Sequence, residues 1–415
     1  MIKRLLLGLI VIIAIVIAVL WWRENRTWDG PVQKVTASAA QIEHGQYLTR
    51  AADCAACHTA PGGAPMAGGV PLETPFGTIF GSNITPSADQ GIGRWTKEQF
   101  YTALTEGVAP GGRHLYPAMP YTSYKGLTRE DSDAIYAYLM TRPAVDVATP
   151  QNEMPFPFNQ RMAMMGWNML FRSAEPLPSA SQGASAQWTR GRYLVDVLGH
   201  CGECHTPRGK LGQMDLDRPL QGGVLGRFSA PAITPDALAQ RGWTPDDVQK
   251  FLTTGIAPQG SAFSEMHTVV DLSTRHLNAD DQKALVTYLM GDKAPQAVAL
   301  KAVASSDNDA GRMTWLNVCA GCHAREGEGK PNVSVSMVSN ATLRQPDGRN
   351  LIVSVLDGLP AQSFPGNQSM QSMPGFASAL SDEEIAGLAN YLRTTWGGQP
   401  GNITPQQVKA LRQHE

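Results

Sequence analysis

The pattern of hydrophobic positions begins with an uncharged apolar run from Leu5 to Trp22, which directly follows Lys3 and Arg4. At about 1.5 Å per residue such a run reaches about 27 Å as a helix, close to the roughly 30 Å core of a bilayer. It predicts one N-terminal membrane helix within residues 1–28, with the basic end in the cytoplasm and the bulk of the chain on the other side. A cleaved signal peptide is the alternative, although the Ala-x-Ala site at 37–39 lies far beyond the apolar run.

Beyond this run, apolar residues with helical spacing recur three times, each time around a Tyr-Leu pair. The predicted helices cover residues 133–140, 280–290 and 381–396. Each helix closes a segment that begins with a short amphipathic helix, opened by Gly45, Gly191 or Gly311. The first two segments also share Ile-Thr-Pro and Trp-Thr strings in their middles. Such repetition predicts three domains of one kind. Their expected boundaries are 40–145, 188–292 and 305–397.

The segments outside the repeats differ from them in composition. Residues 146–187 are rich in Pro, Ser and Ala, which predicts a linker, but they include an apolar, Met-rich helix from Phe158 to Arg172. That helix packs between the first two domains or presents a docking or membrane-facing surface. Residues 398–415 are polar and are interpreted as a tail.

Composition narrows the class of protein. Hydrophobic residues make up 42% of the chain, enough for proper cores, whereas 41 glycines and 29 prolines predict many loops. The formal net charge is −2, from 34 basic and 36 acidic residues. This balance leaves no general cationic surface for a nucleic-acid backbone, so no nucleic-acid partner is expected.

All six cysteines lie in one motif, Cys-x-x-Cys-His, which occurs once in each repeat. The three copies are Cys54, Cys57 and His58; Cys201, Cys204 and His205; and Cys319, Cys322 and His323. This motif is the attachment signal for c-type haem, in which the thiols add to the porphyrin vinyl groups and the histidine binds the iron. Zinc would need a second ligand pair near each copy, and a thioredoxin-like pair is expected once, without a trailing histidine. The sequence therefore predicts three covalently bound haem c groups.

The sixth iron ligand decides between electron transfer and catalysis. Met119 and Met373 each precede a proline at a similar distance before the closing helix, and Met266 lies at a comparable place in the second repeat. These methionines are the predicted axial ligands, with Met370 as the competitor of Met373. His267 and His276 are the alternatives to Met266. His/Met ligation raises the reduction potential and leaves no open site for a substrate, so such centres carry electrons.

The exported portion resembles the tri-haem cytochrome c subunits of bacterial membrane-bound dehydrogenases. The strings that carry the resemblance are 45–48, 53–59, 83–86, 91–93, 115–121 and 204–212. The expected fold is mostly α, with three tandem class I cytochrome c-like domains behind one membrane helix. The resemblance implies a catalytic partner subunit of quinoprotein, flavoprotein or molybdenum type, with the alcohol and aldehyde class favoured, and ubiquinone as the acceptor.

The expected function is therefore electron transfer within a dehydrogenase complex at the periplasmic face of the inner membrane. No catalytic residues are expected in this chain. A stand-alone carrier that feeds a terminal oxidase or a periplasmic cytochrome is the first alternative. A multihaem peroxidase is a weaker one, because it needs an open distal position and an acid/base group beside it.

Overall fold

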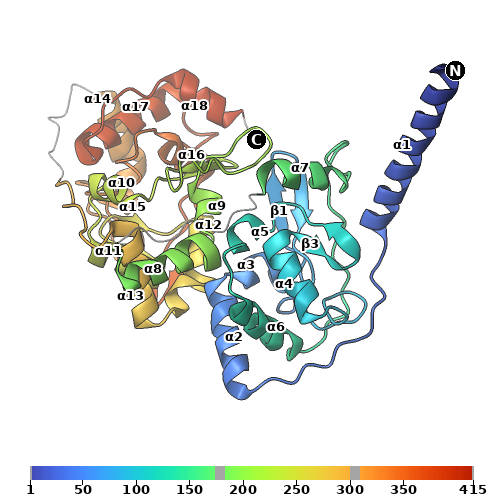
Figure 1. The fold of residues 1–415 in the computed structure, drawn as a ribbon. Coiled ribbons are helices and arrows are strands. Elements are labelled where there is room, and N and C mark those ends of the chain that lie inside the picture. The colour runs from blue at the N-terminus through green and yellow to red at the C-terminus, as the bar shows by residue number, and fades with distance from the viewer. Residues whose placement is uncertain (1, 173–182, 300–308, 414–415) are drawn as a thin grey trace. The chain divides into compact units, whose positions relative to one another are not determined.

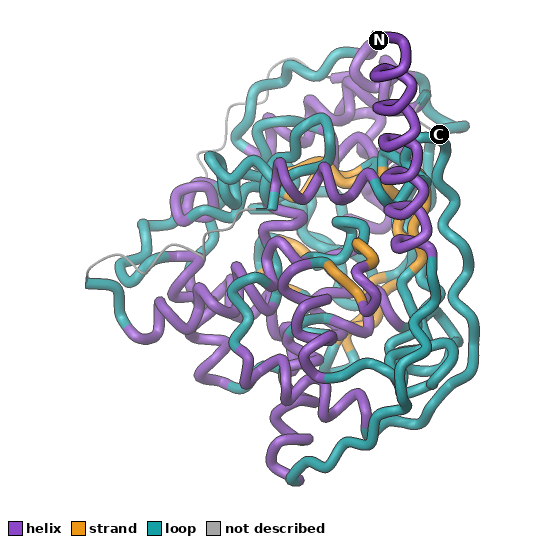
Figure 2. Tube along the Cα trace, turned by 45° about the vertical axis from the view of Figure 1, so that its right-hand side comes forward, coloured by secondary structure: helices purple, strands orange, loops and turns teal. Residues whose placement is uncertain are grey.

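The computed structural model describes residues 2–172, 183–299 and 309–413. Helices and loops make up most of the chain, and the strands are short antiparallel pairs (Figure 2). The contacts divide the chain into two compact units, residues 1–180 with 196–200, and residues 181–195 with 201–415.

The first unit begins with α1 and contains the first Cys-x-x-Cys-His turn as α3 (Figure 1). Its helices are α1 (Ile2–Asn25), α2 (Ala39–Ala51), α3 (Cys54–His58), α4 (Lys97–Glu106), α5 (Tyr121–Tyr124), α6 (Arg129–Met140) and α7 (Ala163–Phe171). Its strands are β1 (Pro71–Thr74), β2 (Gly77–Phe80), β3 (Val108–Ala109) and β4 (Arg113–His114), paired β1 with β2 and β3 with β4.

The second unit carries the other two turns, in α9 and α15. Its earlier elements are α8 (Ala186–Arg192), α9 (Gly202–His205), β5 (Gly223–Leu225), β6 (Phe228–Ala230), α10 (Pro235–Gln240), α11 (Pro245–Thr254), β7 (Ile256–Ala257), β8 (Gly260–Ser261), α12 (Glu265–Leu272) and α13 (Ala279–Met290). Its later elements are α14 (Asp309–Thr314), α15 (Ala320–His323), α16 (Arg349–Asp357), β9 (Gln362–Phe364), β10 (Gln368–Met370), α17 (Asp382–Leu392) and α18 (Pro405–Arg412).

The closing helices form where the periodicity predicts them, because each has a polar N-cap followed by an apolar face. Thr128, Asn278 and Ser381 cap α6, α13 and α17 by accepting the N–H of the third helical residue. At Ser381 the Glu384 carboxylate also accepts the Ser381 N–H, which completes a capping box. The predicted helix at 381–396 is interrupted at Leu392, after which the chain makes a wider turn to Gly397.

The opening helix of each repeat packs on its closing helix: α2 on α6, α8 on α13, and α14 on α17. Glycine makes this approach close enough. A Cβ at Gly45 would lie 1.9 Å from the carbonyl oxygen of Ala134, and one at Gly191 would lie 1.9 Å from that of Ala284. In the third pair, Gly387 meets Gly311, with 3.9 Å between a Cβ built on the former and the latter's Cα. The same crossing therefore organises all three repeats.

We expect Gly45→Ala to destabilise the first unit, because the added methyl overlaps the Ala134 carbonyl and forces α2 away from α6. Overpacking of this kind costs about 1–3 kcal/mol. Thermal unfolding followed by circular dichroism measures the loss. Gly166→Ala in α7 is the matched control, since a Cβ there meets no atom within 4 Å and alanine is the better helix former. Equal melting temperatures for the two variants would contradict the close crossing.

The structure places two segments that the sequence analysis left outside the repeats. In the Met-rich segment, α7 packs on the first unit: Trp167 meets the ring of Tyr121, and the Tyr121 hydroxyl donates to Asn168 Oδ1 over 2.7 Å. The predicted polar tail contains α18, which packs on α17 through the fully buried Val408. The apolar residues in this short helix were too few to predict it.

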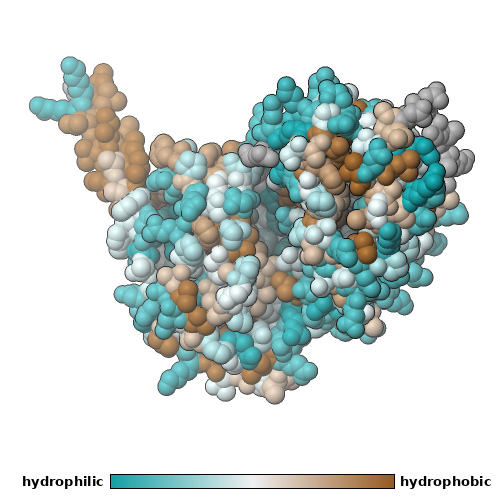
Figure 3. Space-filling model, turned by 180° about the vertical axis from the view of Figure 1, so that it is seen from behind, coloured by the Kyte–Doolittle hydropathy of each residue, from teal (hydrophilic) through white to brown (hydrophobic). Residues whose placement is uncertain are grey.

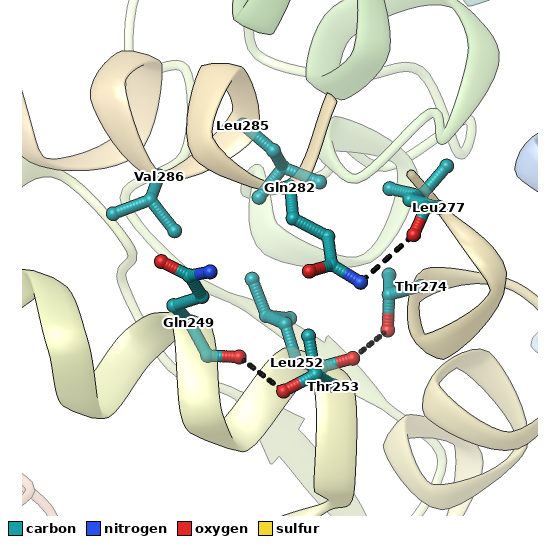
Figure 4. Close-up of a pocket in the computed structure, with 8 residues that line it drawn as sticks. All are labelled: Gln249, Leu252, Thr253, Thr274, Leu277, Gln282, Leu285 and Val286. Atoms are coloured by element: carbon teal, nitrogen blue, oxygen red, sulfur yellow. Dashed lines mark hydrogen bonds between the residues drawn. The ribbon is translucent and has the colours of Figure 1, made fainter. Parts of the chain in front are cut away.

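A small pocket lies between α11 and α13 in the second unit (Figure 4). Its lining residues are Gln249, Leu252, Thr253, Thr274, Leu277, Gln282, Leu285 and Val286. Thr274 donates to the Leu252 carbonyl over 2.6 Å, and Gln282 donates to the Leu277 carbonyl over 2.8 Å. The lining has no cysteine, histidine or methionine, so this pocket is a packing gap between helices and not a site for haem.

Candidate haem sites

Each Cys-x-x-Cys-His motif lies on a tight helical turn: α3 contains the whole first motif, whereas α9 and α15 begin directly after Cys201 and Cys319. No disulfide joins any of these six cysteines, all of which lie in the described part of the chain. Burial is the largest cause that raises the pKa of Cys54 to about 12, with further contributions from Asp53 and Cys57. Burial likewise raises the pKa of Cys57 and of Cys319 to about 11. Burial therefore favours the neutral thiol over the thiolate at these three sulfurs.

The histidine of each motif is oriented by a backbone carbonyl. His58 Nδ1 lies 2.5 Å from the Ser82 oxygen, and His205 Nδ1 lies 2.6 Å from the Pro231 oxygen. In the third repeat the distance from His323 Nδ1 to the Val335 oxygen is 3.4 Å. A hydrogen bond at Nδ1 fixes the ring and its tautomer, so that Nε2 presents a lone pair to a metal. Burial lowers the pKa of all three imidazoles, which favours the neutral form that ligates iron.

Glycines let the chain pass close behind the first two turns. A Cβ at Gly81 would lie 1.7 Å from the Cys57 carbonyl oxygen, and one at Gly223 would lie 2.5 Å from the Cys204 carbonyl oxygen. Ser82, whose carbonyl holds His58, directly follows Gly81, and Pro231, whose carbonyl holds His205, directly follows the β5–β6 hairpin that Gly223 begins. Neither glycine can be picked out from the sequence alone, because its effect depends on contacts across a loop and not on local spacing.

The Met119 segment forms a tight turn between two buried rings. The Met119 N–H donates to the Tyr116 carbonyl over 3.0 Å, and the Met119 carbonyl accepts from the Tyr121 N–H over 2.8 Å. Tyr116 is 7% exposed and Tyr121 is fully buried, so the backbone on each side of Met119 is fixed. A fixed backbone restricts the positions open to the Met119 thioether, which suits a side chain that has to bind a metal.

The two competing methionines of the third repeat lie in different cores. Met373 packs against the core of its own repeat, which includes Trp315, Leu356 and Ile385. Its backbone pairs with Leu359 in both directions, over 2.9 Å each way. Met370 instead packs against a cluster formed by Ala262, Val270 and Phe364. The placement supports Met373 as the candidate ligand of the third site.

The second repeat offers Met266 at the start of α12, packed against the cluster of Ala262, Val270 and Phe364. The two histidine alternatives are engaged elsewhere. His267 Nε2 lies 3.0 Å from the Ser363 carbonyl oxygen, and His276 Nε2 lies 3.0 Å from the Asp271 carbonyl oxygen. Both histidines are hydrogen-bonded through Nε2, whereas Met266 packs within this apolar cluster, so Met266 stays the candidate ligand.

Two buried arginines of the second unit were not predicted. Arg241 is 6% exposed and Arg344 is 7% exposed, and each bonds to a backbone carbonyl, of Ala232 and Val298 respectively. Burial and the neighbouring Arg344 lower the pKa of Arg241 to about 10. Two buried cations side by side are stabilised by an anion, and the carboxylates of a bound haem would supply one. The sequence offers only a loose signal for Arg241, which lies two residues before Trp243-Thr244, while Arg94 lies one residue before Trp95-Thr96.

Asp53, next to the first haem-binding turn, is a buried carboxyl whose Oδ1 has no hydrogen-bond partner among the residues that the structure describes. Burial raises its pKa from 3.8 to about 8. The folded chain then holds a proton that the unfolded chain releases at lower pH, so stability falls as the pH rises between about 4 and 8. We expect Asp53→Asn to remove this decline.

Thermal unfolding at pH 5 and pH 8 checks the expectation. The native chain should lose more stability between the two pH values than the Asp53→Asn variant, because the amide cannot ionise. Asp217→Asn is the control, since Asp217 is exposed and the change should leave the pH dependence as it is. An unchanged pH dependence in Asp53→Asn would show that Asp53 is ionised in the folded chain.

A mostly helical chain that presents three Cys-x-x-Cys-His turns, each with its histidine fixed through Nδ1, has the construction of a c-type cytochrome. Residues 42–143 and 309–396 match the cytochrome c family. The chain belongs to the cytochrome c family, in the group of cytochrome c subunits of dehydrogenases.

Several known proteins are similar over most of this chain. It is 36% identical to the gluconate 2-dehydrogenase cytochrome c subunit of Pantoea cypripedii, over 91% of each chain. It is 36% identical to the fructose dehydrogenase cytochrome subunit of Gluconobacter japonicus, over 92% of this chain and 85% of that protein. It is 40% identical to one subunit of the nicotinate dehydrogenase of Pseudomonas putida, over 88% of this chain, but spans only 32% of that longer protein.

Proposed function

We propose that this chain is the electron-transfer subunit of a membrane-bound dehydrogenase complex, and that three covalently bound haem c groups carry its electrons. The observation that carries the proposal is the threefold repetition of one motif, each time with the histidine Nδ1 beside a backbone carbonyl oxygen. Haem supplies a one-electron redox centre when bound. The three thiol pairs would attach it, and His58, His205 and His323 would ligate its iron from one side.

Met119, Met266 and Met373 would ligate the iron from the other side. With a methionine and a histidine both bound to the iron, no position would remain open for a substrate or a peroxide. The histidines of the three motifs are partly buried, so the protein would limit the access of water to a bound haem. These features suit transfer of electrons and not chemistry on a substrate within this chain.

The similar proteins support the part of the proposal that concerns a dehydrogenase complex. Their names refer to dehydrogenases of gluconate, fructose, alcohol and nicotinate. For this chain we propose a catalytic partner of the quinoprotein, flavoprotein or molybdenum type that oxidises a small alcohol, aldehyde, sugar acid or heterocycle. Ubiquinone in the membrane is the proposed acceptor.

We further propose that α1 is retained as a membrane anchor. It is 24 residues long, it is apolar enough to cross a membrane, and its side chains stand outside the fold (Figure 3). By length and composition alone a signal sequence would pass the same test. The last turn of α1 separates the two possibilities, because it is built into the first unit.

That last turn carries Glu24, whose side chain is fully buried. Its carboxylate accepts from the N–H of His114 and lies beside His114 Nδ1, each over 2.7 Å. Arg113 and Arg161 stand nearby, and burial lowers the pKa of both guanidinium groups, an effect that Glu24 opposes. Removal of the chain up to Glu24 would take away the carboxylate beside His114, Arg113 and Arg161. These contacts therefore support an uncleaved helix.

Retention of α1 predicts that the mature protein has an intact N-terminus, which mass spectrometry of the membrane-extracted chain measures. Glu24→Gln should lower the stability of the first unit, because it leaves His114, Arg113 and Arg161 without their carboxylate. Glu43→Gln, on an exposed helical position, is the control. A mature chain that starts after Glu24 would refute the anchor.

Extraction in mild detergent from native membranes tests the whole proposal. A catalytic subunit with pyrroloquinoline quinone, flavin or molybdenum should copurify, and its substrate should reduce the haems. Addition of a ubiquinone analogue should then reoxidise them. A chain that purifies alone and accepts electrons from no dehydrogenase substrate would instead support a stand-alone carrier that feeds an oxidase or a periplasmic cytochrome.

A further inference from the structure

The second repeat differs from the first in what covers the end of its middle helix. In the first repeat, α4 ends before Gly107, and in the second, α11 ends before Gly255. Both glycines have positive φ, of 66° and 76°, and both begin a Gly-x-Ala-Pro string in which x is valine or isoleucine. The two positions are therefore equivalent in the internal repeat.

An aromatic ring lies against each of these glycines. A Cβ at Gly107 would meet Tyr121 Cδ1 at 2.6 Å, and one at Gly255 would meet Phe364 Cδ1 at 2.5 Å. Tyr121 belongs to the same repeat as Gly107 and follows the candidate ligand Met119 by two residues. Phe364 comes from the third repeat, in the hairpin of β9 and β10. In the first repeat, the ring that covers the glycine comes from the same repeat. In the second repeat, the equivalent ring comes from the third repeat.

The hairpin is held at that place by the residues around the candidate ligand Met266. Phe364 is 6% exposed and forms a buried cluster with Ala262 and Val270, against which Met266 packs. The next residue, His267, contacts the hairpin twice: its Nε2 lies 3.0 Å from the Ser363 oxygen, and its ring lies edge-on to Phe364 with 5.1 Å between centroids.

Several other contacts join the second and third repeats, so the position of the Phe364 ring does not depend on one interaction. Asn350 at the start of α16 accepts from the Ser229 N–H and donates to the Ser229 carbonyl, each over 2.8 Å. Arg227 forms an ion pair with Asp357, with 2.6 Å between Nη2 and Oδ1. A backbone hydrogen bond joins the Ala341 N–H to the Gln259 carbonyl over 2.8 Å.

We propose that Phe364 is a positioning residue for the second haem site: the third repeat completes the second by fixing the start of α12, and with it Met266. The inference rests on the proposed function in one respect, that Met266 ligates iron. It explains why the second repeat lacks the Tyr-Pro-Ala-Met-Pro-Tyr string of the first: its aromatic cover is supplied from another part of the chain.

Phe364→Ala in the full-length chain tests this inference. Haem content should remain three per chain, while one haem becomes partly high-spin and its midpoint potential falls, because a loosened methionine binds iron less fully. Potentiometric titration followed by optical and electron paramagnetic resonance spectra resolves that one centre. Phe364→Leu, which keeps the site filled and the chain folded, should show a smaller shift of the same haem, and Phe364→Tyr should keep the native potential.

The controls separate this inference from the ligand assignment. Gln368→Ala alters the exposed residue opposite Phe364 in the hairpin and should change no potential. Met266→Ala should convert the same haem fully to high-spin. If Met266→Ala has that effect but Phe364→Ala and Phe364→Leu leave all three potentials in place, the positioning role is refuted while the proposed function stands. If Met266→Ala leaves every haem low-spin, the ligand and this inference both fail, and a haem content of three would still support the electron-transfer proposal.

Discussion

Replacing both thiols of one pair, as in Cys201→Ala with Cys204→Ala, is expected to lower the haem content from three to two per chain. The thioether bonds keep a c-type haem in its protein, and these two cysteines are the only ones in the second repeat. The remaining pairs lie in other turns with their own histidines, so their haems should stay. Electron flow through the complex should fall to a small fraction of its native rate.

Haem stoichiometry from the pyridine haemochrome spectrum, set against protein mass, measures this loss. The equivalent double substitutions of Cys54 with Cys57, and of Cys319 with Cys322, are internal controls that should each remove one haem of a different potential. Ser261→Ala in the second repeat, which leaves the turn untouched, should retain all three. Three haems in the double variant, or zinc in place of haem in the native chain, would overturn the assignment of these motifs.

The second large effect concerns the sixth ligand. We expect Met119→Ala to leave three haems attached while it converts one of them from low-spin to high-spin and lowers its midpoint potential. The thioether raises the potential of a haem, so its removal acts on the electronics of the metal and not on attachment. The fixed turn between Tyr116 and Tyr121 contains no second methionine that could substitute for it.

Electronic absorption and electron paramagnetic resonance spectra measure the change of spin state. Met169→Ala is the matched control, because Met169 is 86% exposed on α7 and should affect no haem. In the third repeat, Met373→Ala and Met370→Ala form a second matched pair, of which only the former should produce a high-spin haem. A fully low-spin spectrum in Met119→Ala would show that another residue is the ligand.

The sequence was sufficient for features that depend on local order. The three Cys-x-x-Cys-His turns, the closing helices with their polar caps and the apolar N-terminal helix could all be predicted, because spacing and periodicity encode them within a few residues. Membership of the cytochrome c family was also predictable from short strings around these motifs. The structure and the similar proteins confirm that family and the mostly helical fold.

Features that depend on contacts between distant segments were not predictable. Nothing near Glu24 indicates that its carboxylate is buried against His114, and nothing near Phe364 indicates that its ring lies on Gly255. Arg241 and Arg344 form a buried pair only after two repeats have folded together. Single-sequence periodicity reports which face of an element is buried, and it carries no information on which remote residue covers that face.

The hairpin that brings Phe364 to the second repeat also sets an order of assembly. Ribosomes release the chain from its N-terminus, so Cys201, Cys204 and Met266 emerge well before the ring that covers Gly255. Until then the second repeat lacks that ring beside α12, so a haem would have room to enter and be attached there, and the third repeat would cover the site afterwards. We expect a chain terminated before β9 to load its second haem and to hold it in a less ordered site, whereas the first repeat matures without waiting for later segments.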